Sequence, residues 1–375
     1  MEPAREPRRL LPEARLLVIT AGGALRHASR ARLAEHLRPG DLLVANDAAT
    51  IPASLRGVHG PTRLPIEVRL AGRASLTFDA PPVFAAIVFG AGDHRTATEN
   101  RPAPPPLRPG DELPLGPVRA TVLRLLGHPR LVELRFHGTA ERIWDGIARH
   151  GRPIQYAHVA EPLALWDVWT KVAAVPVAFE PPSAGFLLDW RLLSELRSRG
   201  VELASITLAA GISSTGDPAL DARLPLDEPY QVPLATARAV ARTRVRGGRV
   251  VALGTSAARA LEHAAAGDGL VRSGSGLATR RIGFDTSLQV LDGLVTGIHE
   301  PGDSHYELLR AFAPDEVLAR ATVALHAAGY RSHEFGDFLL VERQRQPVDE
   351  GPDAVACEDV DPTPARSTTW VEQLA

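Results

Sequence analysis

The chain has 375 residues but only one cysteine, one methionine and one lysine, and these shortages exclude several classes of protein. A single cysteine, Cys357, excludes an intramolecular disulfide and any cysteine-rich metal site. No apolar run approaches the roughly 20 residues that a membrane-spanning helix needs. The first residues carry charges of both signs and lead into no apolar signal core. We therefore expect a cytoplasmic protein with no membrane partner, and its length favours two domains.

The chain also has no large excess of one charge. Its 42 Lys+Arg and 44 Asp+Glu residues give a net charge of -2. This balance argues against a strongly basic nucleic-acid-binding protein but permits a local basic patch. One such patch is the stretch from Glu228 to Glu262, which has no acidic residue between its ends and contains Arg238, Arg242, Arg244, Arg246, Arg249 and Arg259. It is a candidate footprint for RNA phosphates, and a solvated helix face explains it equally well.

Several catalytic signatures are missing as well. The 13 histidines include no His-Glu-x-x-His pair, which argues against a zinc hydrolase, and we expect no metal. The only lysine, Lys171, lies in no glycine-rich phosphate loop. Gly274-Ser275-Gly276 lacks the third glycine of a dinucleotide fingerprint, because Thr279 stands there. No Gly-x-Ser-x-Gly turn is present for a serine hydrolase.

Apolar runs and helical periodicity alternate in the first 55 residues and again after residue 150. This alternation is typical of a layered α/β domain. We predict strands over residues 15–19, 41–47, 201–210, 249–253, 288–295 and 338–341. We predict helices over residues 29–37, 186–199, 234–245, 257–266 and 306–328, the last with a break near Pro314.

Short strands without helices fill the region between these two parts. They are predicted over residues 66–70, 75–78, 118–123 and 131–136, and this spacing favours a small antiparallel barrel. We therefore predict a discontinuous α/β catalytic domain (10–55 and 150–343) and an inserted β-barrel-like domain (56–149). Residues 344–375 are rich in Asp, Glu and Pro, which predicts an acidic disordered tail.

The most informative local pattern is an apolar strand that runs through Gly254-Thr255-Ser256 into a helix. Gly254 permits close approach of another backbone or a ligand, and Thr255 or Ser256 can cap the helix. The free N–H groups at a helix start favour an anion, and ligands of open α/β sheets collect beyond the carboxyl ends of the strands. An ordinary cap without a ligand fits the same pattern.

Two further polar positions follow predicted strands. His299 comes just after the stretch 294–298, where a histidine can act as an acid or base near neutral pH or can simply lie in a surface loop. Asn46-Asp47 ends another strand, and these side chains either contact a ligand or form a turn.

Taken together and in order, these segments resemble the S-adenosylmethionine:tRNA ribosyltransferase-isomerase family of queuosine biosynthesis. The matching motifs span residues 10 to 342 and are Pro39–Asp47 with Ile51–Gly57, Pro182-Ser183-Ala184-Gly185, Gly247–Glu262, Thr296–Pro301, and Tyr330-Arg331 with Phe335-Gly336-Asp337. The resemblance implies an α/β domain that carries an inserted β-barrel, in agreement with the pattern above.

The resemblance also implies a reaction and its partners. The family transfers and isomerises the ribosyl group of S-adenosylmethionine onto a 7-aminomethyl-7-deazaguanine in tRNA. Epoxyqueuosine-tRNA forms, and adenine and methionine leave. S-adenosylmethionine would be a co-substrate, tRNA a macromolecular partner, and the chain a monomer without a metal.

By family position, the site would be shared among three groups of residues. His299 would be the catalytic acid or base, with Glu228 as a second candidate. Gly254, Thr255, Ser256 and Arg259 would anchor a carboxylate or phosphate. Asn46, Asp47, Ser183 and Gly185 would line the pocket for the co-substrate.

The chain departs from the family where polar groups are expected. The family's Gly-Leu-His-Phe appears as Gly185-Phe186-Leu187-Leu188, and a later pair of histidines falls on Leu224-Pro225-Leu226. Each lost partner leaves a buried polar group unpaired, at roughly 1–3 kcal/mol. Two alternatives therefore stay open: a divergent paralogue that uses S-adenosylmethionine on a small-molecule acceptor other than tRNA, and a non-catalytic nucleotide- or RNA-binding relative.

Overall fold

The structure is a computed structural model that describes residues 1–7, 14–265 and 267–344. Met1–Gln344 form one unit by their contacts. Cys357 and the predicted acidic tail, apart from Gln344, lie outside the described residues. Within the described residues, no helix is both long and apolar enough to cross a membrane.

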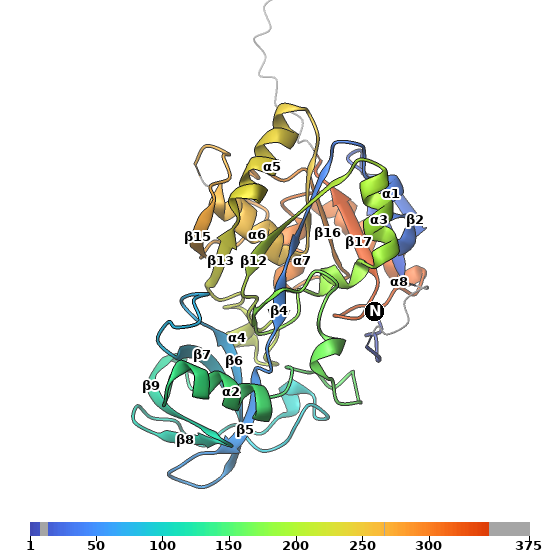
Figure 1. Ribbon diagram of the computed structural model, residues 1–375. Helices are drawn as coiled ribbons and strands as arrows, with labels where there is room; N and C mark the ends of the chain where they lie inside the picture. The colour runs from blue at the N-terminus through green and yellow to red at the C-terminus, as the bar shows by residue number, and fades with distance from the viewer. Residues whose placement is uncertain (8–13, 266, 345–375) are drawn as a thin grey trace, which may run out of the picture. The chain divides into compact units, whose positions relative to one another are not determined.

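Nine strands of the described chain form the larger sheet (Figure 1). In spatial order they are β15 (Gly274–Ala278), β13 (Glu228–Val232), β12 (Glu202–Leu208), β3 (Leu42–Asn46), β14 (Val250–Leu253), β16 (Gly293–Gly297), β17 (Phe338–Glu342), β1 (Arg15–Ile19) and β2 (Leu25–Ser29). The central four, β12, β3, β14 and β16, run parallel to one another. Their carboxyl ends therefore meet at one edge of the sheet, where α/β proteins bind ligands.

Helices cover both faces of this sheet, because alternate strand residues point to opposite sides. Leu17, Leu42 and Val44 pack in one core with α5 (Leu234–Val245), α6 (Thr255–Ala264), α7 (Ser304–Leu309) and α8 (Asp315–Ala327). Leu16 and Leu43 pack in another core with α1 (Leu33–His36) and α3 (Trp190–Ser198). The predicted layered α/β architecture is confirmed.

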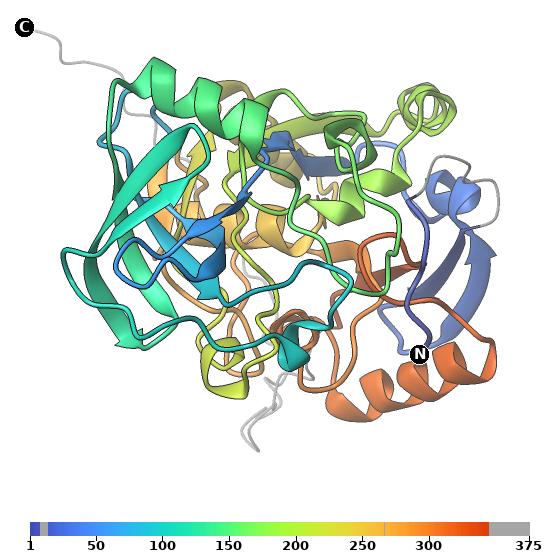
Figure 2. The same ribbon diagram turned by 90° about the horizontal axis from the view of Figure 1, so that it is seen from below.

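A second, antiparallel sheet forms a nearly closed barrel (Figure 2). Its strands are β5 (Ser54–Val58), β6 (Pro65–Gly72), β7 (Val83–Phe89), β10 (Leu131–Phe136), β9 (Val118–His128) and β8 (Glu112–Leu115), in that spatial order. The N–H of Gly60, just after β5, donates to the Glu112 carbonyl at the start of β8 (2.8 Å), which brings the two edge strands together. Helix α2 (Ala140–His150) covers the barrel with Ile143 and Ile147. The predicted small antiparallel barrel is confirmed.

The two sheets share part of their cores. Phe179 and Ala209 pack in the same hydrophobic cluster as the barrel residues, and β4 (Ala48–Thr50) pairs with β11 (Val175–Ala178) beside them. The predicted division into a discontinuous α/β domain and an inserted domain, with its boundaries, stays a prediction.

Three predicted elements differ from the structure. Residues 75–78 form no strand. The helix predicted from residue 186 begins at Trp190 instead, because the Asp189 carboxylate accepts the Leu192 N–H (2.8 Å) as its N-cap, and Ser183–Leu187 form a separate 3₁₀ turn, η4. The strand predicted from residue 288 begins at Gly293, because the Glu262 carboxylate accepts the N–H groups of residues 289–291 that a neighbouring strand would otherwise bind.

Candidate active site at the carboxyl edge of the parallel strands

Three segments predicted to form the site meet at this edge. The Gly254 N–H donates to the Val295 carbonyl of β16 (2.7 Å), so the Gly254 turn lies beside the strand that leads to His299. Gly254 has a φ of 96°, and a Cβ there would lie 3.4 Å from the Cβ of Ala184 in η4. The glycine is therefore required for the left-handed backbone of the turn, whereas a Cβ there would make only an ordinary contact with η4.

The cap of α6 differs from the expectation. Gly254 is the N-cap residue, whereas Thr255 and Ser256 are the first two residues of the helix, and no side chain caps it. The Ser256 hydroxyl instead accepts from the Asn46 side-chain amide (3.1 Å). Because no side chain occupies the helix start, its free N–H groups keep the capacity to bind an anion.

Asn46 and Asp47 hold strands together. The Asn46 amide donates to the Leu208 carbonyl (2.9 Å) and its oxygen accepts the Leu208 and Ala48 N–H groups (3.0 and 3.1 Å). The Asp47 carboxylate accepts from the hydroxyls of Ser205 and Thr207 (2.7 and 2.6 Å). These bonds, with the one to Ser256, make Asn46 a positioning residue for the edge.

Glu228 and Arg259 form a buried ion pair. The Arg259 guanidinium donates to the Glu228 carboxylate and to the Ala278 carbonyl (2.9 Å), and Glu228 also accepts the Gly211 N–H (2.8 Å). Burial raises the pKa of Glu228, and Arg259 opposes that rise. The carboxylate anchor predicted for Arg259 therefore has an internal carboxylate as its partner in this structure.

His299 is half-buried beside a second histidine. Its Nε2 lies 3.0 Å from the Thr296 hydroxyl, and the His305 ring lies 4.7 Å away between centroids. Burial lowers the pKa of His299 well below 6.5, and the nearby His305 and His333 lower it further. The imidazole is therefore neutral at pH 7, the form that can accept a proton.

Ser183 and Gly185 lie in η4, and Gly185 packs against Thr170. A Cβ on Gly185 would come within 2.8 Å of Thr170 Cγ2, so the turn packs tightly there. The Thr170 hydroxyl is buried and, among the described residues, makes no hydrogen bond. Buried hydroxyls are normally satisfied, so this one has the capacity to bind a water or a ligand atom.

A carboxyl group that the sequence did not single out also lies at this edge. Glu180 is 7% exposed, its N–H donates to the Ala210 carbonyl just beyond β12 (3.3 Å), and its carboxyl lies 2.5 Å from the Tyr156 hydroxyl. The carboxyl also accepts the Ser213 N–H (3.0 Å), and the Tyr156 hydroxyl donates to the Ser214 carbonyl (3.0 Å). Burial raises the pKa of Glu180 to about 7. This pair can hold or release a proton near neutral pH.

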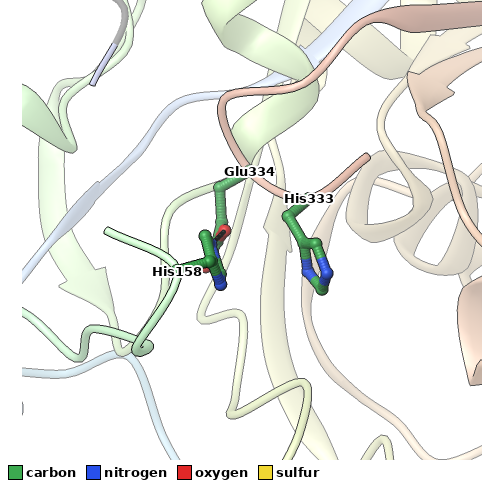
Figure 3. Close-up of side chains that lie close together, drawn as sticks. All are labelled: His158, His333 and Glu334. Carbon is green, nitrogen blue, oxygen red and sulfur yellow. Dashed lines mark hydrogen bonds and ion pairs between the residues drawn. The ribbon is translucent and has the colours of Figure 1, made fainter. Parts of the chain in front are cut away.

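His158, His333 and Glu334 lie close together from two separate loops (Figure 3). Their potential ligand atoms all lie within 4.8 Å of one another, and a His₂Glu set matches known zinc ligands. However, the two imidazole rings stack at 4.5 Å, and His158 already bonds Glu334 (3.0 Å). Stacked rings do not aim their in-plane nitrogens at one point, so the geometry is that of a hydrogen-bonded pair. The expected absence of a metal stays a prediction.

Three of these residues stand in or beside the family motifs of the sequence. His333 and Glu334 stand inside the C-terminal motif, between Arg331 and Phe335, and Glu180 stands two residues before Pro182 of the central turn. Tyr156 and His158 belong to none of the motifs and follow no strand or helix pattern in the sequence, and in the structure they lie in an irregular segment.

The chain is similar to known proteins over most of its length. A family model described as "Queuosine biosynthesis protein" matches residues 2–341. The S-adenosylmethionine:tRNA ribosyltransferase-isomerase of Sorangium cellulosum is 33% identical over 354 residues (88% of this chain, 92% of the relative). That of Synechococcus elongatus is 32% identical over 353 residues (90% and 91%). A crystal structure of the S-adenosylmethionine tRNA ribosyltransferase of Thermotoga maritima is 25% identical, covers 90% of this chain and 95% of that one, and has a TM-score of 0.47. The chain belongs to the queuosine biosynthesis protein family.

Proposed function

We propose that this chain transfers and isomerises the ribosyl moiety of S-adenosylmethionine onto a 7-aminomethyl-7-deazaguanine in tRNA. The products are epoxyqueuosine-tRNA, adenine and methionine. The proposal includes a cytoplasmic location and action as a monomer.

The observation that carries the proposal is the meeting of family motifs at one sheet edge. The Gly254 turn, η4 and the strand end before His299 come from distant parts of the chain, yet the Gly254 N–H donates to the Val295 carbonyl (2.7 Å), and Ala184 of η4 packs in one core with Leu253 and Val295. The relatives that match about nine-tenths of the chain carry the name of this activity.

The chemistry assigns a role to each group. The reaction needs a base near the acidic carbon beside the sulfonium, and neutral His299 supplies one. It needs a proton donor for departing adenine, and the buried Glu180–Tyr156 pair is a candidate. It needs an anchor for the methionine carboxylate, for which the uncapped start of α6, at Thr255 and Ser256, is suited.

The direct experiment measures adenine release by chromatography. The protein is incubated with S-adenosylmethionine alone, with unmodified tRNA, and with tRNA that carries the aminomethyl base. We expect adenine only with the last of these. Release with a small-molecule acceptor in place of tRNA would favour the paralogue. Calorimetric binding of S-adenosylmethionine without release under any condition would favour the non-catalytic relative.

A further inference from the structure

A charged cavity of about 460 Å³ lies between the barrel and the segment that follows α2. It is lined by β5 and β6, by the loop around His94, by the end of α2 and by residues 152–163. A second cavity, of about 580 Å³, lies against β13 and β15. Among the described residues, neither cavity is lined by His299 or by the Gly254 turn.

Positive charge predominates in the first cavity. Its lining includes four arginines but only two carboxylates, and the arginines are Arg56, Arg95, Arg149 and Arg152. One of the carboxylates, Glu67, is already neutralised by the buried guanidinium groups of Arg69 (2.8 Å) and Arg101 (2.5 Å), which lie outside the lining. The cavity therefore presents an excess of cationic groups to an incoming anion.

The lining arginines are weakly paired. Arg56 and Arg95 share the single carboxylate of Asp93, each at 3.4 Å, and both are largely exposed. Arg149 pairs with Asp145 on the surface of α2. Within the described part of the chain, Arg152 has no carboxylate within ion-pair distance, and it is exposed. Such arginines can exchange their partners for phosphate at little cost.

The rival basic segment, between Glu228 and Glu262, is differently arranged. Arg242 pairs with Glu202 (2.6 Å), Arg249 with Asp41 (2.6 Å), and Arg259 with Glu228. Glu202 and Asp41 stand at the amino ends of β12 and β3, so this part of the segment lies at the edge of the sheet opposite the candidate site. Three of its six arginines are therefore paired with carboxylates of the fold.

The charged cavity, by contrast, adjoins the candidate site. Gln155 lines it, and the next residue, Tyr156, bonds Glu180. His158 follows two residues later, and three residues of extended chain span at most about 11 Å. The segment that lines the cavity therefore continues directly into the residue that contacts Glu180.

We propose that this cavity binds backbone phosphate of the tRNA substrate through Arg56, Arg95, Arg149 and Arg152. This assignment rests on the proposed function for its choice of polynucleotide. The cavity provides several cations around a space that is large enough for a phosphodiester group, next to the edge where the modified base would react. Bidentate guanidinium contacts suit phosphate oxygens.

The test compares two double variants that remove equal charge. Arg95→Gln with Arg152→Gln changes the cavity, and Arg238→Gln with Arg246→Gln changes exposed arginines of the rival segment. Fluorescence anisotropy measures binding of tRNA across a salt series, calorimetry measures S-adenosylmethionine binding, and adenine release is followed separately. We expect the cavity variant to bind tRNA about tenfold more weakly, with a salt slope reduced by about one for each lost phosphate contact. S-adenosylmethionine binding is expected to be unchanged.

The outcomes separate this proposal from the proposed function. Equal tRNA binding by the cavity variant and the rival-segment variant would overturn the cavity assignment and leave the function intact. If the wild type binds tRNA through the cavity but releases no adenine with any tRNA, the function fails and the phosphate site stands. If the wild type binds no tRNA but inorganic phosphate raises its Tm and not that of the cavity variant, the polynucleotide assignment is wrong. If the wild type binds neither tRNA nor inorganic phosphate, the proposed phosphate site is wrong.

Discussion

Asp41 and Asp337, two acidic residues of the family motifs, each accept hydrogen bonds from two backbone N–H groups. Asp41 accepts the N–H groups of Arg38 and Arg249 (2.8 and 3.0 Å), and Asp337 accepts those of Arg15 and Arg331 (2.9 Å each). Polar residues in a family motif therefore need not touch the ligand. Here they fix the positions of elements that carry other site residues.

At the residue scale, His299→Ala is the sharpest test of the mechanism. General acid–base catalysis contributes about 10²–10⁴-fold, so we expect adenine release to fall at least about 100-fold while the far-UV spectrum is unchanged. Because the pKa of His299 lies well below 6.5, the wild type should keep its activity as the pH falls through 6.5. Rates close to wild type in the variant would remove His299 from the mechanism.

His305→Ala is the matched control for His299→Ala. His305 lowers the pKa of His299, so its removal should move the acidic limb of the kcat/KM profile to higher pH while turnover at pH 8 is retained. A profile that does not move would mean that His299 is not the base whose titration limits the rate at low pH.

Glu180→Gln tests the buried carboxyl through stability. The folded carboxyl keeps its proton up to about pH 7, whereas the unfolded one releases it near 4.5, so its stabilisation is complete below pH 4.5 and is lost as the pH rises through 7. Glutamine mimics the protonated form. Between about pH 5.5 and 8.5 the free energy of unfolding of the wild type should fall by about 2 kcal/mol relative to that of the variant. The fall takes place over the roughly 1.5 pH units below the folded pKa of about 7, at about 1.4 kcal/mol per unit. Urea unfolding at both pH values measures this, and a constant difference would contradict the raised pKa.

At the element scale, the strand-to-helix turn depends on one glycine. Gly254→Ala places a Cβ at a φ of 96°, so we expect a loss of about 1–2 kcal/mol in the free energy of unfolding. Gly22→Ala is the control, because Gly22 lies in open space without a left-handed φ, and it should change stability by less than about 1 kcal/mol. Equal effects of the two substitutions would show that the Gly254 turn is not constrained.

At the scale of the whole molecule, the shared core predicts that the two sheets unfold together. Phe179 is fully buried, its N–H donates to the Ala210 carbonyl beyond β12, and its ring lies 6.3 Å from that of Phe84 in the barrel. Phe179→Ala should cost about 3–5 kcal/mol and leave a single unfolding transition. Val245→Ala, at a position that is 88% exposed, should cost less than about 0.5 kcal/mol. Tryptophan fluorescence and circular dichroism measure both, and two separate transitions would mean that the sheets are independent.

Local patterns predicted more of the fold than of the site. The strand that ends at Leu253 and the helices near Leu234 and Asp315 follow from apolar periodicity and from Gly and Pro. The helix start at Trp190 was missed because apolar spacing continues through residues 186–188 although Asp189 provides the cap. The strand predicted from residue 288 begins too early because the apolar run there has the pattern of a strand. In the structure its backbone N–H groups bind a distant carboxylate, that of Glu262.

The sequence by itself determined the alternation of elements, the small antiparallel barrel and the family, because these depend on neighbouring residues and on the order of short motifs. Only the tertiary structure decided which polar groups meet. Tyr156 and Glu180 are 24 residues apart, and His158 and Glu334 are 176 apart. Such pairs, and the arginines around the charged cavity, have no periodicity along the chain, because burial and charge at a site are set by segments that folding brings together.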